Sequence, residues 1–153
     1  MDGVIYKATG GFYYVSAGVD VFECRARGRF RHDHVTPLVG DRVRIAPLES
    51  GKGVVDEILP RKNSFRRPAV SNIDQLVLVA SGATPRTDPF LLDRMAASAA
   101  LAGAAPVICI NKCDLDPAGE LFAIYTSAGL PTALVSARTG EGMDSLAALL
   151  PDE

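Results

Sequence analysis

The sequence predicts two domains, an all-β barrel over residues 1–67 and an α/β domain with a parallel sheet over residues 68–153. Three observations support this fold class: short β-rich segments in the front part, strand and helix patterns that alternate in the rear part, and a change of charge between them. Residues 1–67 hold 12 Lys and Arg against 8 Asp and Glu, a net charge of +4, whereas the remainder holds 4 against 10, a net charge of −6. A basic module therefore precedes an acidic one.

The front part contains five short segments rich in Val, Ile, Tyr and Phe. Gly-Gly, Ala-Gly and longer polar loops separate them, as is typical of strands joined by turns. Five strands in such a short stretch suit a small closed barrel, and the OB-fold is the leading candidate. The predicted strands are residues 3–8, 11–16, 19–26, 41–46 and 53–59.

Arginines recur at every second position near the third of these segments. If that stretch is extended, four guanidinium groups lie on one face about 6.6 Å apart, twice the rise of a strand residue. A nucleic-acid backbone would follow such a track, and nearby aromatic rings would stack on bases. The alternative is a solvated strand face above an aromatic core. The predicted RNA-binding residues are Arg25, Arg27, Arg29, Arg31, Arg42 and Arg44, with Phe12, Tyr13, Tyr14, Phe22 and Phe30 as candidate stacking residues.

A basic segment between two prolines, Pro60 and Pro68, is predicted to link the two domains. Its residues 61–67 read Arg-Lys-Asn-Ser-Phe-Arg-Arg.

The rear part alternates between apolar runs and helical patterns. The run at residues 75–80 is expected for a strand covered on both faces. Asp88 and Pro89 then begin a helix that ends near Gly103, by the usual preferences at a helix start and stop. Two further strands follow, ending at Asn111 and Ser136.

Each of those two strands is followed by a helix. Asp116 as N-cap and Pro117 at the first helical position begin one helix, and Gly129 ends it. The last helix carries Met143 and Leu146. Together these elements make three parallel βα units.

The tetrapeptide Asn111-Lys112-Cys113-Asp114 matches the N-K-x-D pattern that reads guanine in GTPases. The Asp114 carboxylate would accept hydrogen bonds from the ring N–H and the exocyclic amine of guanine, a pair of donors that adenine does not present. A buried acceptor built for such donors rejects the wrong base, since a mismatch leaves it unpaired. The alternative is a surface turn with an Asp cap.

A second loop, Ser136-Ala137 followed by Arg138, comes one βα unit later. In GTPases a loop of this kind contacts the guanine carbonyl oxygen through a backbone N–H. The carboxyl ends of parallel strands meet at one edge of a sheet, so both loops are expected there. The alternative roles are a helix cap for Ser136 and a solvated charge for Arg138, where GTPases often carry Lys.

No membrane or secretion feature stands out in the sequence. No apolar run approaches the roughly 18 residues needed to span a bilayer, and the N-terminus has neither a basic stretch nor an apolar stretch of a secretory signal. The expected location is the cytoplasm, with no membrane partner. Three cysteines without a C-x-x-C pair indicate neither a disulfide framework nor a zinc site, so no metal ligand is predicted.

The order of these features resembles the circularly permuted, ribosome small-subunit-dependent GTPases of the RsgA (YjeQ/YloQ, EngC) type. The resemblance spans essentially the whole chain, and it is carried most specifically by residues 39–43, 61–63, 67–68, 72–75, 111–114 and 136–137. It implies an OB-fold domain that contacts ribosomal RNA, then the first part of a circularly permuted P-loop GTPase domain. It also implies that Asn111, Lys112, Asp114, Ser136, Ala137 and Arg138 bind guanine.

The sequence also departs from this family. The phosphate-binding pattern G-x-x-x-x-G-K-[ST] does not occur, and Asp116 to Gly119 matches the D-x-x-G pattern only by letter. The resemblance implies GTP and Mg²⁺ as ligands of the intact protein, and zinc only in a C-terminal segment beyond this chain. Since phosphoryl transfer depends on phosphate and metal contacts, this chain alone is expected to be inactive.

The expected function is that of a GTP-binding factor in maturation of the small (30S) ribosomal subunit, whose partners are that subunit, its rRNA and guanine nucleotide. An exposed edge of the three-strand sheet is expected to allow self-association. Two alternatives remain at this point: a non-catalytic RNA- or ribosome-binding module, and an assembly protein that uses neither nucleotide nor RNA.

Overall fold

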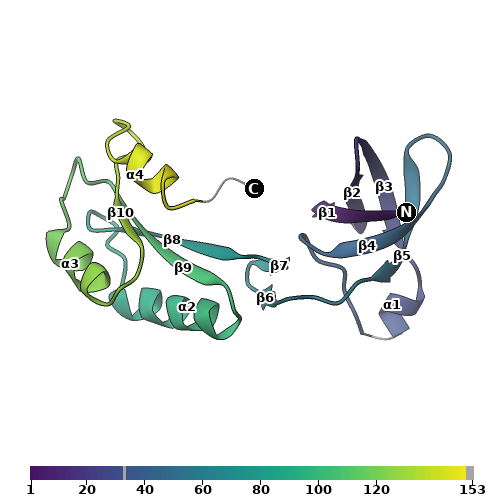
Figure 1. The fold of residues 1–153 in the computed structure, drawn as a ribbon, viewed down its shortest axis with the longest axis horizontal. Helices are drawn as coiled ribbons and strands as arrows, with labels where there is room; N and C mark the ends of the chain where they lie inside the picture. The colour runs from purple at the N-terminus through teal and green to yellow at the C-terminus, as the bar shows by residue number, and fades with distance from the viewer. Residues whose placement is uncertain (33, 151–153) are drawn as a thin grey trace. The chain divides into compact units, whose positions relative to one another are not determined.

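The computed structural model describes residues 1–32 and 34–150, and for Arg31 it describes the backbone only. The chain divides after Ile73 into two compact units, residues 1–73 and 74–153 (Figure 1).

The first unit is a closed barrel of five strands in the order β1-β2-β3-β5-β4. Neighbouring strands are antiparallel except β3 and β5, which are parallel. Each of the five segments predicted as a strand forms one, so the predicted barrel is confirmed. The strands are β1 (Asp2–Thr9), β2 (Phe12–Ala17), β3 (Asp20–Ala26), β4 (Arg42–Pro47) and β5 (Lys52–Ile58).

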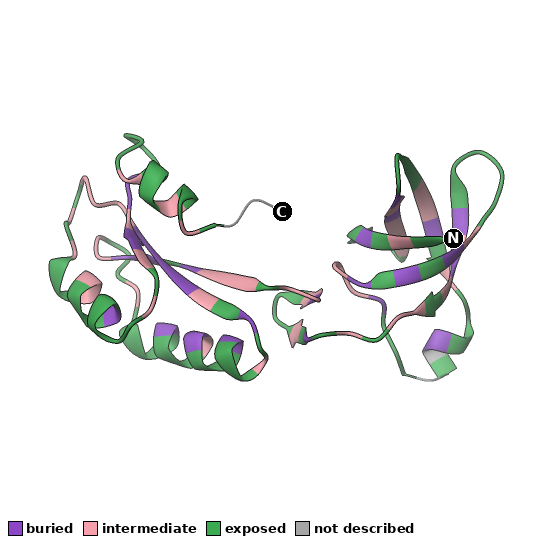
Figure 2. Ribbon diagram, in the orientation of Figure 1, coloured by how far each residue is buried: buried purple, intermediate pink, exposed green. Residues whose placement is uncertain are grey.

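Alternating residues of these strands fill the barrel. Val15 of β2 is buried between exposed or half-buried neighbours, and Ile5 of β1 lies opposite it. At the β1–β2 connection, Gly10 and Gly11 have φ values of 57° and 80°, the pair of positive angles that a two-residue type I′ hairpin turn requires. The fully or largely buried residues of this core are Ile5, Val15, Cys24, Phe30, Val43, Ile45 and Val55 (Figure 2).

The predicted run of four alternating arginines on one extended face is wrong. Strand β3 ends at Ala26, and Arg29 and Arg31 lie in the short helix α1 (Arg29–His32). The chain leaves the strand because Phe30 packs into the barrel core with only 8% of its surface exposed. Burial of one aromatic ring outweighs continuation of the basic strand.

The segment predicted as a linker belongs to the first unit instead. Strand β6 (Ser64–Arg66) pairs with β7 (Ala69–Ser71) as an antiparallel hairpin. Before the hairpin, Arg61 makes two hydrogen bonds of 2.7 Å to the buried carboxylate of Asp41. These long-range contacts hold the basic segment against the barrel.

The second unit has a parallel three-strand sheet in the order β10-β9-β8, as predicted. Helices α2 and α3 pack on one face of the sheet around Leu78, Ile108 and Ile110, and α4 packs on the other face against Cys109 and Val135. Successive strand residues point to opposite faces, which is why Cys109 belongs to a different cluster from its neighbours. The elements are β8 (Gln75–Ser81), α2 (Pro89–Leu101), β9 (Ala105–Asn111), α3 (Gly119–Ser127), β10 (Thr132–Leu134) and α4 (Met143–Ala147).

The predicted start of α2 is confirmed, whereas that of α3 is wrong. Asp88 caps α2 by accepting a 2.9 Å hydrogen bond from the N–H of Phe90. Helix α3 begins two residues later than expected, at Gly119 instead of Pro117. Asp116 accepts a 2.8 Å hydrogen bond from the N–H of Ala118 and so closes a local turn before the helix.

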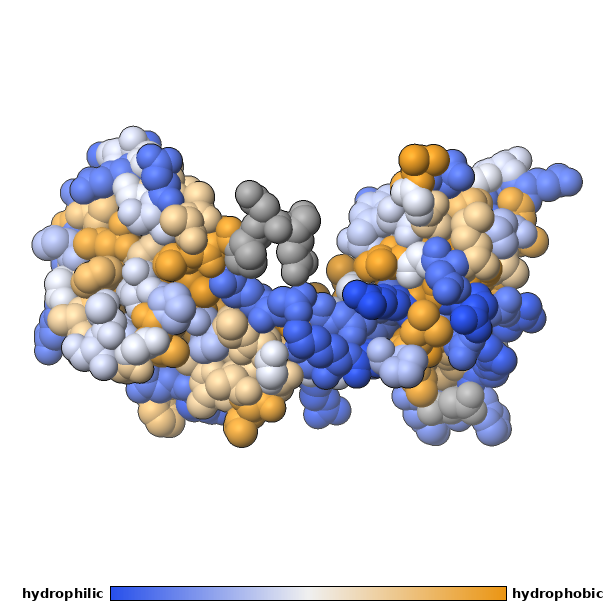
Figure 3. All heavy atoms as spheres, in the orientation of Figure 1, coloured by the Kyte–Doolittle hydropathy of each residue, from blue (hydrophilic) through white to orange (hydrophobic). Residues whose placement is uncertain are grey.

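Apolar side chains reach the surface of the second unit (Figure 3). The edge strand β8 has one hydrogen-bonded neighbour, β9, and its Val79 is 66% exposed. Among the described residues, no helix is both long enough and apolar enough to cross a membrane.

Helices α2 and α3 are joined by a hydrogen bond of 2.9 Å from the Tyr125 hydroxyl to Asp93. Burial and this hydrogen bond raise the pKa of Tyr125 from 10.0 to about 12. The raised pKa favours folding below pH 10, and this contribution is lost as the pH rises through 12. We expect the free energy of unfolding of the second unit to fall by about 1.4 kcal/mol between pH 9 and pH 11 through this group. Urea unfolding of wild type and Tyr125→Phe at both pH values measures the difference, and an equal decline in both proteins would contradict it.

Candidate guanine-nucleotide site

The site lies at the carboxyl edge of the parallel sheet in the second unit. Asn111 is the last residue of β9, and Ser136 follows β10 by two residues. Because β9 and β10 are parallel neighbours, both motifs lie at the same edge, where α/β sheets bind their ligands.

Asn111 joins the two motif loops. Its side-chain Oδ1 accepts a 2.8 Å hydrogen bond from the N–H of Lys112 and a 3.0 Å hydrogen bond from the N–H of Ala137. A second connection runs from the N–H of Cys113 to the carbonyl of Val135 at 3.0 Å. The asparagine is therefore a brace that fixes one loop against the other.

Asp114 carries the most informative geometry of the site. The Ser136 hydroxyl donates a 2.7 Å hydrogen bond to Oδ1 of Asp114, and Ser136 is fully buried. Oδ2 of Asp114 is also buried, yet it receives no hydrogen bond within the described residues. Arg138 Nε lies 3.2 Å from Oδ2, an ion-pair distance without hydrogen-bond geometry. A buried acceptor left unpaired costs about 1–3 kcal/mol, so a ligand that donates to Oδ2 gains affinity. The donor edge of guanine fits this carboxylate.

The loop after β10 holds Ser136 in place. The Ser136 hydroxyl oxygen accepts a 3.2 Å hydrogen bond from the N–H of Thr139. The backbone N–H of Ser136 donates a 2.9 Å hydrogen bond to the backbone carbonyl oxygen of Glu141. Gly142 ends this loop with a φ of 72°, and a Cβ there would lie 2.0 Å from the carbonyl oxygen of Leu134. Only glycine permits this close approach, which fixes the end of the loop that carries Ser136.

Lys112 and Arg138, the two cations of the motif loops, lie in different environments. Lys112 has a φ of 68°, and its ammonium group donates a 2.9 Å hydrogen bond to the carbonyl of Thr84 in the loop after β8. Arg138 keeps 79% of its side chain exposed. Thr84 was not singled out from the sequence, because a contact through a backbone carbonyl leaves no residue-type pattern.

Cys113, at the variable position of the motif, is a half-buried free thiol. Burial raises the pKa of the Cys113 thiol, and the nearby charge of Glu141 raises it further. Since the thiolate is the nucleophile and the metal ligand, the raised pKa opposes both roles. Among the described residues, no group of three or more His, Cys, Asp and Glu side chains could hold a metal ion.

The arginines predicted to bind RNA differ in their partners. Arg27 pairs with the carboxylate of Asp56, and Arg29 donates to the Asp56 carbonyl oxygen. Arg44 pairs with Asp2 at 3.1 Å and with Glu57 at 2.6 Å. The carboxylates partly neutralise Arg27 and Arg44, whereas Arg29 is held by an uncharged backbone carbonyl.

The other three predicted arginines are Arg25, Arg42 and Arg31. Arg25 has no acidic partner in the described part of the chain and lies over the Phe12 ring, with 4.6 Å between the guanidinium carbon and the ring centroid. Arg42 is exposed. The side chain of Arg31 lies outside what the structure describes.

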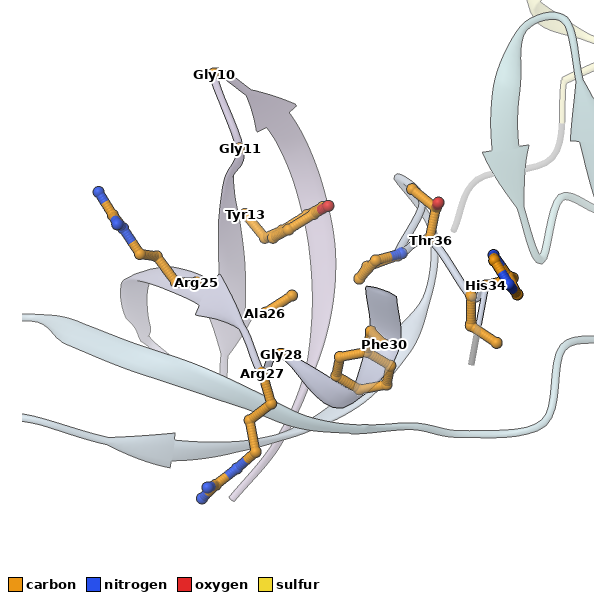
Figure 4. A pocket seen from close by; sticks show the side chains of 12 residues that line it. Gly10, Gly11, Tyr13, Arg25, Ala26, Arg27, Gly28, Phe30, His34 and Thr36 are labelled. Atoms are coloured by element: carbon orange, nitrogen blue, oxygen red, sulfur yellow. The ribbon is translucent and has the colours of Figure 1, made fainter. Parts of the chain in front are cut away.

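Beside Arg25 the barrel surface is hollowed by a cavity of about 740 Å³. The side chains of Tyr13 and Ala26 face this hollow, whereas those of Arg25 and Arg27 point away from it (Figure 4).

Comparison with known proteins places the chain in a family. The RsgA N-terminal domain family matches residues 2–55, and the RsgA GTPase family matches residues 58–153. The chain belongs to the RsgA GTPase family. The resemblance predicted from the sequence and the predicted fold class are thereby confirmed.

Individual family members are similar in sequence to this chain over nearly all of its length. The small ribosomal subunit biogenesis GTPase RsgA of Caldanaerobacter subterraneus subsp. tengcongensis is 40% identical over 156 residues, which cover 100% of this chain and 53% of the relative. The RsgA of Moorella thermoacetica is 40% identical over 152 residues, 98% of this chain and 52% of its own. The chain thus spans about half the length of these curated relatives.

Two solved structures share the fold. The circularly permuted GTPase YloQ matches with a TM-score of 0.73 and 36% identity over 97% of this chain and 54% of its own. YjeQ from Thermotoga maritima matches with a TM-score of 0.79 and 31% identity. The match covers 97% of this chain and 56% of YjeQ.

Proposed function

We propose that this chain is part of a GTP-binding factor that acts in maturation of the small ribosomal subunit. The observation that carries the proposal is the Asp114 carboxylate: Ser136 fixes one oxygen, and the other oxygen is buried without a hydrogen-bond donor at the ligand-binding edge of the sheet. The names of the RsgA relatives support the ribosomal role.

The residues of the site have distinct proposed roles toward guanine. Asp114 accepts from the ring N–H and the exocyclic amine, and Ser136 and Ala137 shape the loop whose backbone contacts the guanine carbonyl oxygen. Asn111 braces both loops, Lys112 lays its aliphatic stem along the base, and Arg138 lies at the rim.

The phosphates and Mg²⁺ belong to the intact protein in this proposal. GTP hydrolysis is assigned to full-length members, and zinc to a segment outside this chain. Because G-x-x-x-x-G-K-[ST] does not occur in these 153 residues, we propose that the chain alone does not hydrolyse GTP.

The barrel unit supplies the proposed contact with ribosomal RNA in the cytoplasm. Arg25 and Arg42, which lack an acidic partner among the described residues, are its best-placed cations. A non-catalytic RNA- or ribosome-binding module is the second candidate, favoured by the missing phosphate-binding pattern. Self-association through the edge strand β8 is a further proposal.

Nucleotide titrations test the guanine site. We expect GMP, but not AMP, to shift the backbone NMR signals of Asn111, Asp114 and Ala137 in a ¹⁵N-labelled sample. Binding is expected to be weak, since contacts to the base alone hold the nucleotide. Equal shifts with AMP would remove the guanine assignment.

A phosphate-release assay tests the lack of hydrolysis separately. With GTP and Mg²⁺, we expect this chain to release phosphate at the rate of a protein-free sample. Release above that rate, or tight Mg²⁺-dependent GTP binding by calorimetry, would contradict the proposed inactivity.

A further inference from the structure

The outer surface of strands β1, β2 and β3 carries an unusual set of aromatic rings. Val15 and Ala17 of β2 point into the barrel, so the alternation of the strand turns Phe12 and Tyr14 outward. Tyr14 pairs with Lys7 of β1 on one side and with Glu23 of β3 on the other. Paired residues of antiparallel strands share a face, so these side chains lie together.

A β-bulge adds a third ring to this face. The register of β1 against β2 shifts between Ile5 and Lys7. In a regular strand Lys7 would point into the barrel like Ile5, but the bulge turns both Tyr6 and Lys7 outward. The Tyr6 and Tyr14 ring centroids lie 6.4 Å apart, and the Lys7 ammonium lies 5.0 Å from the centroid of Tyr14. Tyr6 keeps 50% of its surface exposed.

The cations on this face are available to an anion. No carboxylate of the described residues lies at ion-pair distance from Lys7 or Arg25, unlike Arg27 and Arg44, which have acidic partners. Lys7 lies over Tyr14 and Arg25 over Phe12, so each cation is paired with a ring. Glu23, the acid on this face, accepts a 3.0 Å hydrogen bond from the Tyr14 hydroxyl.

A hollow of about 740 Å³ beside the β1–β2 turn adjoins this face. Gly10, Gly11 and Tyr13 line it together with Arg25, whose guanidinium group points away from the hollow and over the Phe12 ring (Figure 4). No Asp or Glu is among the lining residues that the structure describes. A chain of anions that crosses the face would therefore meet no repulsive carboxylate on entering the hollow.

We propose that Tyr6, Lys7, Phe12, Tyr14 and Arg25, here called the outer aromatic face, bind single-stranded RNA by stacking unpaired bases. The proposal rests on the RNA contact in the proposed function and names its surface and its ligand. Outward-facing rings, of which Tyr6 is exposed and Phe12 and Tyr14 are half-buried, lie beside cations that have no carboxylate partner. Single strands require this combination, because every unpaired base offers a π-face and every linkage a charge. In a duplex the base faces are stacked on one another, so the phosphates of a duplex would contact the cations alone.

Fluorescence anisotropy with labelled RNA tests the proposal. The probes are a twelve-nucleotide unstructured RNA and a hairpin of equal total charge, both at low salt. We expect Phe12→Leu and Tyr14→Leu each to weaken binding of the single strand about tenfold, the loss typical of one stacked base. Tyr14→Phe keeps the ring and should bind as wild type does. Lys7→Gln should lower the salt dependence of binding by about one counterion.

Arg94→Gln is the matched control, since Arg94 is an exposed cation that lies over a ring, Phe90, but belongs to the second unit. It should change single-strand binding less than twofold. Thermal unfolding midpoints within a few degrees of wild type show that the leucine variants are folded.

Three outcomes would overturn the assignment. Leucine variants that bind the single strand like wild type would remove the outer aromatic face while leaving the RNA contact of the proposed function intact. Tighter binding of the hairpin than of the single strand would show recognition by charge alone. No binding of either RNA by folded wild-type protein at low salt would overturn this inference and the RNA contact together, but not the guanine site.

Discussion

Replacing Asp41 with alanine is expected to destabilise the first unit by about 3–5 kcal/mol. The carboxylate is fully buried and accepts four hydrogen bonds: two of 2.7 Å from Arg61, one of 2.5 Å from the Ser71 hydroxyl and one of 2.7 Å from the N–H of Leu38. Alanine leaves all these donors without their acceptor, and one of them is a charged guanidinium that is only 26% exposed. The loss therefore reaches the range measured when one partner of a buried ion pair is removed.

Urea unfolding followed by tyrosine fluorescence measures this effect. Three of the four tyrosines, Tyr6, Tyr13 and Tyr14, lie in the first unit, so the signal reports mainly on the barrel. Arg44→Ala is the control, because the Arg44 ion pairs are half-exposed and contribute about 0–1 kcal/mol. If Asp41→Ala unfolded at the same urea concentration as the control, the network would not stabilise the barrel.

The same network explains why the connection between the units was misread from the sequence. Residues 61–67 have the charges of a linker and lie between two prolines, Pro60 and Pro68, so local sequence patterns predict a linker there. Their structure is decided by Asp41, which lies 20 residues before Arg61 in the sequence. A pairing over that distance has no local periodicity, so sequence reasoning cannot find it without knowing the fold.

The predicted run of four arginines on one extended face is wrong for a related reason. Alternating arginines predict an extended strand only where no other interaction determines the backbone conformation. Here the burial of Phe30 in the barrel core determines it. The β-strands themselves were predictable, since alternation in β2 and β4 repeats at every second residue. The bulge that turns Lys7 outward was not predictable, because it changes the register without a glycine or proline to mark it.

The motifs of the candidate site could be found from the sequence because two independent rules point to the same residues. A four-residue pattern names Asn111 and Asp114, and parallel strands bring their ends together with Ser136. What the sequence could not provide is the asymmetry of the carboxylate, in which one oxygen has a donor and the other has none. That asymmetry leads to the sharpest prediction for the site.

Replacing Asp114 with asparagine is expected to reverse the base preference from guanine to xanthine. Ser136 donates to Oδ1, and a variant that keeps this hydrogen bond places its amide oxygen there and its amide nitrogen at the position of the buried Oδ2. There it donates a hydrogen bond, and it meets the exocyclic amine of guanine, another donor. Xanthine carries a carbonyl oxygen at that position and accepts instead. The loss for guanine should be on the order of 10²-fold or more, as expected when a buried polar pair is mismatched.

NMR titrations with GMP and XMP on both proteins measure the reversal. Ser136→Ala combined with Asp114→Asn is the discriminating variant, because without the hydroxyl either end of the amide can face the base. The double variant should bind GMP and XMP with similar affinity, while Asp114→Asn alone prefers XMP. If Asp114→Asn bound GMP as wild type does, the buried Oδ2 would not be the atom that reads the base. If instead the single and double variants shared one preference for XMP, Ser136 would not set the orientation of the side chain, and the hydrogen bond of 2.7 Å would serve the loop alone.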